Sequence, residues 1–506
     1  MTQREKWGTK LGVIMAVAGS AVGLGNFLRF PVQAAQHGGG AFMIPYFLAF
    51  ILLGIPLMWI EWAIGRHGGL FGHGTAPFIF PRLAQNRFVK YLGVIGIFGP
   101  LVIFIYYIYI ESWLLGYAFF ALTGKLLSLA TPESMTGFLL AYQGLAPGSN
   151  ILTAYFFFLV TFVLNGLIIY RGIRGGIEKL CNIAMPLLFT FALIILLRVL
   201  SMGPGVLDGL GFLWNPDFSA LVDAKVWLAA AGQVLFTLSV GIGVIMTYAS
   251  YLSHGDDIVL SGLTAASTNE SAEVVLGGSI VIPAAFAFLG VAGAQAAARS
   301  GAFNLGFVTM PVIFGHIPFG QIISFLWFAL LFLAGITSSV SLMEPAVAFV
   351  RDEFRVERKI AAKRLLLLTF VLCQFPIMFL GQGVLDELDF WAGTFCLVVF
   401  ATIEVFLFIW VFGMDKAWTE MHHGAELKIP RVYRFIMKYI TPAFLLFVLV
   451  FWFIQQGWAT ILMQGVGEAN RPYVLATRIG LIVLFAGIAY FVRKAWYNQK
   501  ISGEIT

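Results

Sequence analysis

The chain has 506 residues, of which 11% are charged and 60% are hydrophobic, and its mean hydropathy is +0.90. A soluble globular protein carries about 25% charged residues, because its surface must be wetted by water. The composition therefore excludes a cytosolic enzyme, a secreted disulfide scaffold and a disordered chain, and it predicts a polytopic helical membrane protein. The three cysteines lie in apolar stretches without metal-ligand spacing, so they indicate no redox role.

A membrane-spanning helix needs about 20 mostly apolar residues. Twelve such stretches follow one another, and no low-complexity linker or soluble domain interrupts them. We therefore expect a single transmembrane domain over residues 1–506, with spans near 10–35, 41–65, 89–123, 151–170, 177–200, 225–253, 258–293, 321–350, 360–380, 384–412, 432–456 and 473–495.

The basic residues indicate an orientation. Twelve spans place both termini on one side, and cytoplasmic loops of membrane proteins are enriched in Lys and Arg. With the N-terminus inside, most basic residues become cytoplasmic, which leaves for the outside or the outer helix ends only Arg29, Lys125, Arg198, Lys225, Arg299, Arg471 and Arg478. We expect a multi-pass protein of the plasma (inner) membrane with both termini cytoplasmic. The net charge of +6 then belongs to membrane loops and indicates no nucleic-acid partner.

Two spans are interrupted near their middles. Residues 18–26 (AGSAVGLGN) and 236–243 (FTLSVGIG) are rich in Gly and Ser, and each Gly weakens a helix by about 1 kcal/mol relative to Ala. Unwound backbone survives at membrane depth only where protein or a wet cavity satisfies its polar groups. For either segment alone, close helix packing is an equal alternative.

Each interrupted span begins a set of five spans, and an odd number inverts the second set relative to the first, as in many secondary transporters. We expect repeat one at about 10–200, repeat two at about 225–412 and two further helices at about 432–495. Broken helices present N–H groups to anions and carbonyls to cations, which predicts a zwitterion carried with sodium. The apolar segment 302–320, broken by Gly and Pro, is expected to form a lid in an outer vestibule.

A series of motifs carries a family resemblance: AVGLGNFLRFP at 21–31, QHGGGAFMIPY at 36–46, MWIEWAIGR at 58–66, IYYIYIESW at 105–113, FTLSVGIG at 236–243, TNESAE at 268–273, AGITSSVSLMEP at 334–345 and LDELDFWAGT at 385–394. In this order the motifs resemble the neurotransmitter:sodium symporter family, most closely its bacterial LeuT-type amino-acid transporters. The resemblance covers nearly the whole chain. It implies an all-α fold with twelve transmembrane helices, a 5+5 inverted repeat, broken helices 1 and 6, and transport by alternating access.

The resemblance also implies a central substrate site. The substrate carboxylate would meet the N–H groups of Leu24 and Gly25 and the hydroxyl of Tyr107, and its amine would meet carbonyls of the broken helices and the Ser239 hydroxyl. Ser20 departs from the family pattern, because LeuT-type sequences often have Asn there, and this bears on selectivity. The full expected set is Ser20, Ala21, Leu24, Gly25, Ile103, Tyr107, Phe236, Thr237, Ser239, Ile242, Ser338 and Leu342.

Gly23 points to an amino acid, because similar monoamine carriers have an Asp at this position, whereas an amino acid supplies its own carboxylate. The expected side-chain pocket is apolar and consists of Ile103, Phe236, Ile242 and Leu342. We therefore expect a hydrophobic amino-acid substrate of Leu size or larger, with Ala, Met, Phe and Trp left open.

Two sodium sites follow from the same resemblance, and oxygen ligands suit a hard cation. The first would use Ala21, Asn26, Thr237 and Asn269 together with the substrate carboxylate, so that sodium and substrate bind cooperatively. The second would use Gly19, Val22, Ala334, Thr337 and Ser338. Without the resemblance, hydroxyls at 337 and 338 on an apolar helix more often bond their own backbone.

Several charged residues remain inside the membrane, where they are costly and usually functional. The resemblance implies an outer gate of Arg29 and Asp389 and an inner gate of Arg4 and Asp352 with Trp7 packed beside it. Glu273 stands where chloride-dependent relatives have a small hydroxyl residue, so we expect it to act as a fixed anion and chloride to be unnecessary. Coupling of its protonation to proton counterflow is left open.

The sequence leaves rivals to this hypothesis. The first is a sodium-coupled carrier of another small amine or an osmolyte, and the second is a transport-inactive amino-acid sensor or a channel. No enzyme motif such as HExxH or GxxxxGK[ST] occurs, so we expect no catalytic residues. The expected partners are an amino acid, sodium and the lipid bilayer, and a homodimer is left open.

Overall fold

The computed structural model describes residues 5–501, except for the side chains of Ser219, Ala220 and Ala224. In this range every regular element is a helix, as predicted. The first half contains α1 (Lys10–Ala21), α2 (Phe30–Gln36), α3 (Gly40–Ala49), α4 (Ile55–Leu70), α5 (Ala76–Ala84), α6 (Ile95–Leu122), α7 (Pro132–Tyr142), α8 (Leu152–Gly172), α9 (Lys179–Leu200) and α10 (Gly205–Trp214).

The second half contains α11 (Ala224–Thr237), α12 (Val244–Ala249), α13 (Ile258–Glu270), α14 (Ser279–Arg299), α15 (Ala302–Asn304), α16 (Met310–Gly315), α17 (Gly320–Leu342), α18 (Glu344–Phe354), α19 (Arg358–Met378), α20 (Val384–Leu388), α21 (Cys396–Val405), α22 (Met414–His422), α23 (Val432–Phe435), α24 (Thr441–Trp452), α25 (Trp458–Ile461) and α26 (Arg471–Ile501). Short π- or 3₁₀-helical segments join or extend several of them, including η1 (Gly25–Arg29), η3 (Arg87–Val94), η5 (Ile173–Glu178), η7 (Ser271–Gly278) and η8 (Leu305–Thr309).

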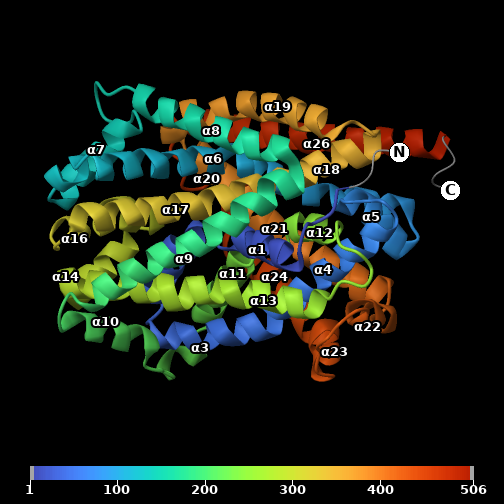
Figure 1. Cartoon of the computed structure of the whole chain (residues 1–506), viewed down its shortest axis with the longest axis horizontal. Coiled ribbons are helices and arrows are strands. Elements are labelled where there is room, and N and C mark those ends of the chain that lie inside the picture. Colours follow the sequence, from blue (N-terminus) through green and yellow to red (C-terminus); the bar gives the residue numbers. More distant parts are fainter. Residues whose placement is uncertain (1–4, 502–506) are drawn as a thin grey trace.

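The long helices run along the longest axis of the molecule (Figure 1). Helices α7, α10 and α16 lie at one end, on the left of the view, and α5, α22 and the last turns of α26 lie at the other. Apolar side chains are exposed along the outer helices, for example Leu367 and Val371 on α19 and Ile482 and Val483 on α26. Such faces fit contact with lipid, in agreement with a multi-pass membrane protein.

Within residues 5–501, nine helical stretches are long and apolar enough to cross a membrane, or ten if the bent run from α1 through α2 counts as one. The stretch Leu152–Leu200 has 49 residues, about 73 Å at 1.5 Å per residue, which exceeds twice a hydrocarbon core of about 30 Å. Its Gly172 has a φ of 85° and divides it. Helices α11 and α12 are each too short to qualify. These two places account for the difference from twelve spans, a number that stays a prediction.

Close backbone approaches hold the inner helices together. Gly65 and Gly69, one turn apart on α4, face the end of α12, where added Cβ atoms would lie 2.1 Å from the Met246 carbonyl oxygen and 2.3 Å from the Ser250 carbonyl oxygen. Small residues at this spacing let two membrane helices touch backbone to backbone. The second half of the interrupted sixth span is thereby held against a continuous helix.

Candidate functional site

The first interruption lies directly after α1. The chain leaves the helix at Val22, which has extended backbone angles, and it resumes at η1 with a bend of 47°. The Gly23 N–H donates to Asn26 Oδ1 at 2.8 Å. The break predicted within residues 18–26 is confirmed, and the side chain of Asn26, the second residue of η1, partly satisfies its freed backbone.

The second interruption separates α11 from α12. Ser239, Gly241 and Gly243 have φ angles of 53°, 74° and 89°, in the left-handed region that favours glycine. The Gly241 N–H donates to the buried Glu61 carboxylate, and Ser239 Oγ donates to the Ser20 carbonyl oxygen at 3.1 Å. The break predicted within residues 236–243 is therefore also confirmed, and the two broken spans touch each other at their breaks.

A cavity of about 470 Å³ lies between the two breaks and helices α6, α17 and the α20 region. Its volume falls in the range of small-molecule sites, about 300–1,000 Å³. All twelve residues of the expected substrate set line it: Ser20, Ala21, Leu24, Gly25, Ile103, Tyr107, Phe236, Thr237, Ser239, Ile242, Ser338 and Leu342. Residues far apart in the sequence thus meet at one place, although their roles toward a substrate stay predictions.

Gly23 also lines this cavity and has little room around it. An added Cβ would lie 3.1 Å from Ser338 Oγ and 3.4 Å from Tyr107 Oη. The position faces the hydroxyls of Tyr107 and Ser338, so a carboxylate side chain at position 23 would project among the expected substrate-binding groups.

The polar side chains of the first expected sodium site lie together beside the cavity. Asn26 Nδ2 lies 2.8 Å from Asn269 Oδ1 and 3.2 Å from Thr237 Oγ1, and Asn269 Nδ2 lies 3.0 Å from the same Thr237 hydroxyl. Asn26 and Asn269 are fully buried. These neutral oxygen-bearing groups suit a hard monovalent cation, which would be transported cargo, provided that a negative charge lies close by.

The second expected sodium site joins α17 to the end of α1. Ser338 Oγ lies 3.4 Å from the Gly19 carbonyl oxygen and 3.0 Å from the Ala334 carbonyl oxygen, and Thr337 Oγ1 donates to the Ala334 carbonyl at 3.1 Å. Both hydroxyls therefore bond backbone carbonyls, as expected without the resemblance, yet Ser338 also reaches across to α1. Four of the five expected residues thus share contacts, namely Gly19, Ala334, Thr337 and Ser338.

Glu273, in η7 after α13, is fully buried beside the Asn26 cluster. Its carboxylate accepts hydrogen bonds from Gln233 Nε2 at 2.6 Å, from Asn26 Nδ2 at 3.3 Å and from the Thr237 hydroxyl. Beside it, the Tyr46 hydroxyl donates to the carboxylate of Glu270 at 2.7 Å. A second buried carboxyl group thus lies at the same place, which the sequence analysis did not identify.

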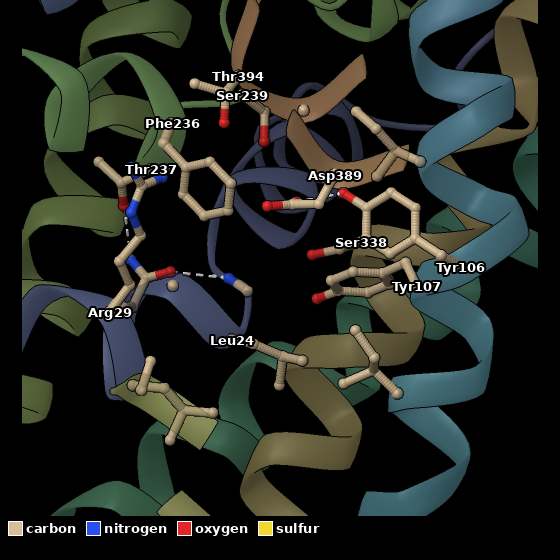
Figure 2. Close-up of a pocket in the computed structure, with 18 of the residues that line it drawn as sticks. Leu24, Arg29, Tyr106, Tyr107, Phe236, Thr237, Ser239, Ser338, Asp389 and Thr394 are labelled. Carbon is tan, nitrogen blue, oxygen red and sulfur yellow. Dashed lines mark hydrogen bonds between the residues drawn. The ribbon is translucent and has the colours of Figure 1, made fainter. Parts of the chain in front are cut away.

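Both residues of the expected outer gate line the cavity (Figure 2). The Arg29 guanidinium lies 4.2 Å from the centre of the Phe236 ring, and Tyr106 donates to Asp389 at 2.6 Å. In the view of Figure 2, Arg29 and Asp389 lie on opposite sides of that ring. Among the described residues no salt bridge joins Arg29 to Asp389, so this structure holds the two charges apart, and their action as a gate stays a prediction.

The expected inner gate lies partly outside the described residues, because Arg4 precedes them. Asp352 accepts from the Arg351 Nε at 2.7 Å. Trp7 donates to the Tyr248 carbonyl oxygen at 3.0 Å, and the rings of these residues meet edge to face at 5.2 Å. The N-terminal segment therefore packs against α12, and the place of Trp7 beside an inner gate stays a prediction.

Sequence reasoning missed the ion pairs around this segment. Glu5 pairs with Arg358 at 2.9 Å, and Arg358 pairs with the fully buried Glu344 at 2.6 Å. Burial raises the pKa of Glu5, as does Glu344, although Arg358 opposes the shift. A further carboxylate, Glu178, accepts from the Gly8 and Thr9 N–H groups at 2.8 and 3.1 Å. The only sequence signal for these residues was their position inside or beside expected membrane spans.

The cavity also has lining residues outside the expected set, among them Tyr106, Asp386 and Phe303. Tyr106 directly precedes Tyr107 in the IYYIYIESW motif, so its place on the same helix was a usable signal. Phe303 belongs to the apolar segment 302–320, which forms α15, η8 and α16 and reaches the cavity at Ala302 and Phe303. That segment thus reaches the cavity, and its action as a lid in an outer vestibule stays a prediction.

Comparisons with known proteins agree with this architecture. A model of the sodium:neurotransmitter symporter family matches residues 4–132 and 146–465. An uncharacterized sodium-dependent transporter of Methanocaldococcus jannaschii is 31% identical over 94% of this chain and 94% of its own. The sodium-dependent serotonin transporter of Drosophila melanogaster is 26% identical over 90% of this chain and 80% of its own.

Among solved structures, that of MhsT in complex with L-phenylalanine matches with a TM-score of 0.76 at 31% identity, covering 88% of this chain and 99% of MhsT. The match supports a LeuT-type fold with two broken helices. The repeat boundaries are not tested by it and stay predictions. By the family match and the fold together, the chain belongs to the sodium:neurotransmitter symporter family, a family of transporters and not of enzymes.

Proposed function

We propose that the protein is a sodium-coupled symporter of hydrophobic amino acids that works by alternating access and needs no chloride. The observation that carries the proposal is the cavity between the two helix breaks, with Gly23 among its lining residues. A zwitterion fits such a place, because N–H groups at the start of η1 attract its carboxylate and carbonyls at the breaks attract its amine. MhsT, 31% identical, was solved with L-phenylalanine, a hydrophobic amino acid.

Sodium would bind in two places in this mechanism. The Asn26, Thr237 and Asn269 group would hold one ion beside the substrate carboxylate, with Ala21 completing it, and the Thr337 and Ser338 group would hold the second between α1 and α17. Each ion is a substrate of the transport cycle. Because the first group is neutral, the substrate carboxylate supplies a charge that favours the ion, and binding of the two is cooperative.

Glu273 would supply a permanent negative charge at the first sodium group. It lies within hydrogen-bonding distance of Asn26 and Thr237, both members of that group. A buried carboxylate replaces the charge that a bound anion would otherwise bring, which is the reason for proposing transport without chloride.

Alternating access would use the two ends described above. Approach of Arg29 to Asp389 would close the cavity over Phe236, and release of Trp7 from Tyr248 would open the opposite end. We place that opposite end, with both termini, in the cytoplasm of a cell whose plasma (inner) membrane holds the protein, because basic residues concentrate there.

The test is uptake of labelled amino acids into proteoliposomes, with external sodium and chloride replaced in turn. A panel of Ala, Leu, Met, Phe, Trp, Lys and Glu separates a hydrophobic preference from a general one. We expect sodium-dependent uptake of the apolar members and no change when gluconate replaces chloride. Uptake that persists without sodium would contradict symport, and loss of uptake without chloride would contradict the role of Glu273 alone.

A second candidate is a carrier of a small amine, favoured by the 26% identity to a serotonin transporter. An amine without a carboxylate needs a counter-charge near the break, and Gly23 provides none. Serotonin competing with leucine uptake in the same proteoliposomes would favour this candidate. Binding of leucine without any sodium-dependent accumulation would instead indicate a sensor.

A further inference from the structure

A cluster of basic residues lies at the end of the molecule where α5 and the last turns of α26 meet, far from the cavity. It consists of Arg87 and Lys90 on η3 and Arg493 on α26, two elements that pack against each other. We call these three residues the Lys90 cluster. The transport site does not use them.

Lys90 is the unusual member, because it is only 6% exposed. Its Nζ lies 4.7 Å from the centre of a Trp496 ring and 5.1 Å from the Tyr91 ring. The charged groups that act on its ammonium are Arg87 and Arg493, which are cations themselves. Within residues 5–501 no carboxylate lies within salt-bridge distance of any of the three.

Other buried basic side chains at this end of the molecule have carboxylate partners. Arg66 is fully buried and pairs with Glu420 at 3.0 Å, and Arg358 pairs with Glu344 at 2.6 Å. Removing an ion from water is expensive unless a counter-charge is present, and cation–π contacts compensate only part of that penalty. Unlike these two arginines, the Lys90 cluster has no carboxylate partner among the described residues, so an anion from outside the described chain would stabilise it.

We propose that the Lys90 cluster binds the phosphate group of an anionic phospholipid at the membrane surface that this end of the molecule meets. Arg87 and Arg493 are exposed and both act electrostatically on the Lys90 ammonium, so a phosphate that binds here from outside would be attracted by all three cations. Arginine and lysine are the usual ligands of phosphate groups.

The surroundings select a lipid as the source of the phosphate. Phe88 is 64% exposed, Leu92 44% and Phe491 49%, and all three lie beside cluster residues in the chain. Apolar and aromatic side chains around a basic group are typical of the zone where headgroups meet acyl chains. A soluble phosphate would gain nothing from these side chains, whereas a phospholipid would cover them.

The experiment uses the full chain in detergent micelles and measures lipid binding by native mass spectrometry together with the thermal unfolding temperature. Phosphatidylglycerol, phosphatidylcholine of the same acyl chains and inorganic phosphate are added in parallel. We expect phosphatidylglycerol to bind and to raise the unfolding temperature, and the other two to do neither. Equal effects of the two lipids, or an effect of inorganic phosphate alone, would overturn the proposal.

Variants locate the site. Arg87→Gln and Arg493→Gln are exposed changes, and each is expected to weaken phosphatidylglycerol binding about fivefold, the equivalent of about 1 kcal/mol for one basic residue at a membrane surface. Lys90→Gln should weaken it further, and Lys90→Arg should restore it, which separates loss of the charge from misfolding. Lys416→Gln is the matched control, since Lys416 is another basic residue at the same end beside an aromatic ring. Equal losses in the control and the cluster variants would overturn the assignment of the site.

Discussion

Gly25 offers a sharp test of the transport site. It is the first residue of η1, where the substrate carboxylate is proposed to bind. A Cβ at this position would lie 2.7 Å from Phe236 Cε1 and 3.1 Å from its Cδ1. Since carbon atoms in contact lie about 3.5–4.0 Å apart, the ring would have to move by about 1 Å.

The effects of Gly25→Ala on folding and on binding have different sizes. Overpacking costs about 1–3 kcal/mol, while Ala stabilises a helical residue by about 1 kcal/mol relative to Gly, so the free energy of unfolding falls by about 2 kcal/mol at most. The helix preference of Ala does not offset the effect on substrate binding, because the displaced Phe236 ring, which Arg29 covers, itself lines the cavity. We therefore expect the dissociation constant for leucine to rise about 5- to 100-fold.

The assay is equilibrium binding of labelled leucine to the purified protein at saturating sodium, accompanied by thermal unfolding. Gly480→Ala, on α26, is the matched control, because nothing lies within 4 Å of a Cβ added there. It should leave binding unchanged. Wild-type leucine affinity in Gly25→Ala, with normal folding, would refute the placement of the substrate between η1 and Phe236.

Further predictions address the ions and the inner end. The Glu273→Ser variant is expected to show no uptake when gluconate is the only anion, and uptake is expected to return when chloride is added. Uptake by this variant without chloride would contradict a fixed-anion role. Thr337→Val is expected to raise the sodium concentration for half-maximal uptake at least tenfold, because a ligand oxygen is lost, whereas Thr369→Val, whose hydroxyl also bonds its own helix, should not. Burial raises the pKa of Glu420, but the hydrogen bond from His67 and the Arg66 guanidinium lower it by more, so the pKa lies below its usual range. The Glu420 carboxylate then stabilises the fold above the ordinary carboxyl pKa, and this contribution is lost as the pH falls through the lowered value. Glu420→Gln should therefore lower the unfolding temperature at pH 7 and differ less from the wild type in acid, while Glu426→Gln, an exposed change, should have little effect at either pH.

Composition and motif order predicted the main features of this protein. The two breaks were visible because Gly and Ser concentrate there, and the twelve expected substrate residues were found at one cavity because their motifs keep a fixed order along the chain. Such features depend on residues that are close in the sequence, so they can be read without knowing how distant helices pack.

Long-range pairing could not be predicted in the same way. Arg66 meets Glu420 across 354 positions, and nothing in either helix pattern indicates how the two helices are rotated toward each other. The distance between Arg29 and Asp389 changes with the conformation of the protein. Because every conformation of the transport cycle has the same sequence, the sequence could not predict this distance. The span count was uncertain where a single Gly divides a long apolar stretch, because hydropathy does not report backbone angles.

The attachment of the N-terminal segment has a thermal consequence. Gly8 and Thr9 are held by Glu178, and Trp7 donates to a carbonyl group and meets a single ring edge to face, so several of the contacts are polar groups that water can replace. Freeing this segment exposes little apolar surface compared with unfolding, and the heat capacity of the protein should hardly change. The rate of inner opening is therefore expected to follow a nearly straight Arrhenius plot, whereas the unfolding free energy of the same protein curves strongly with temperature.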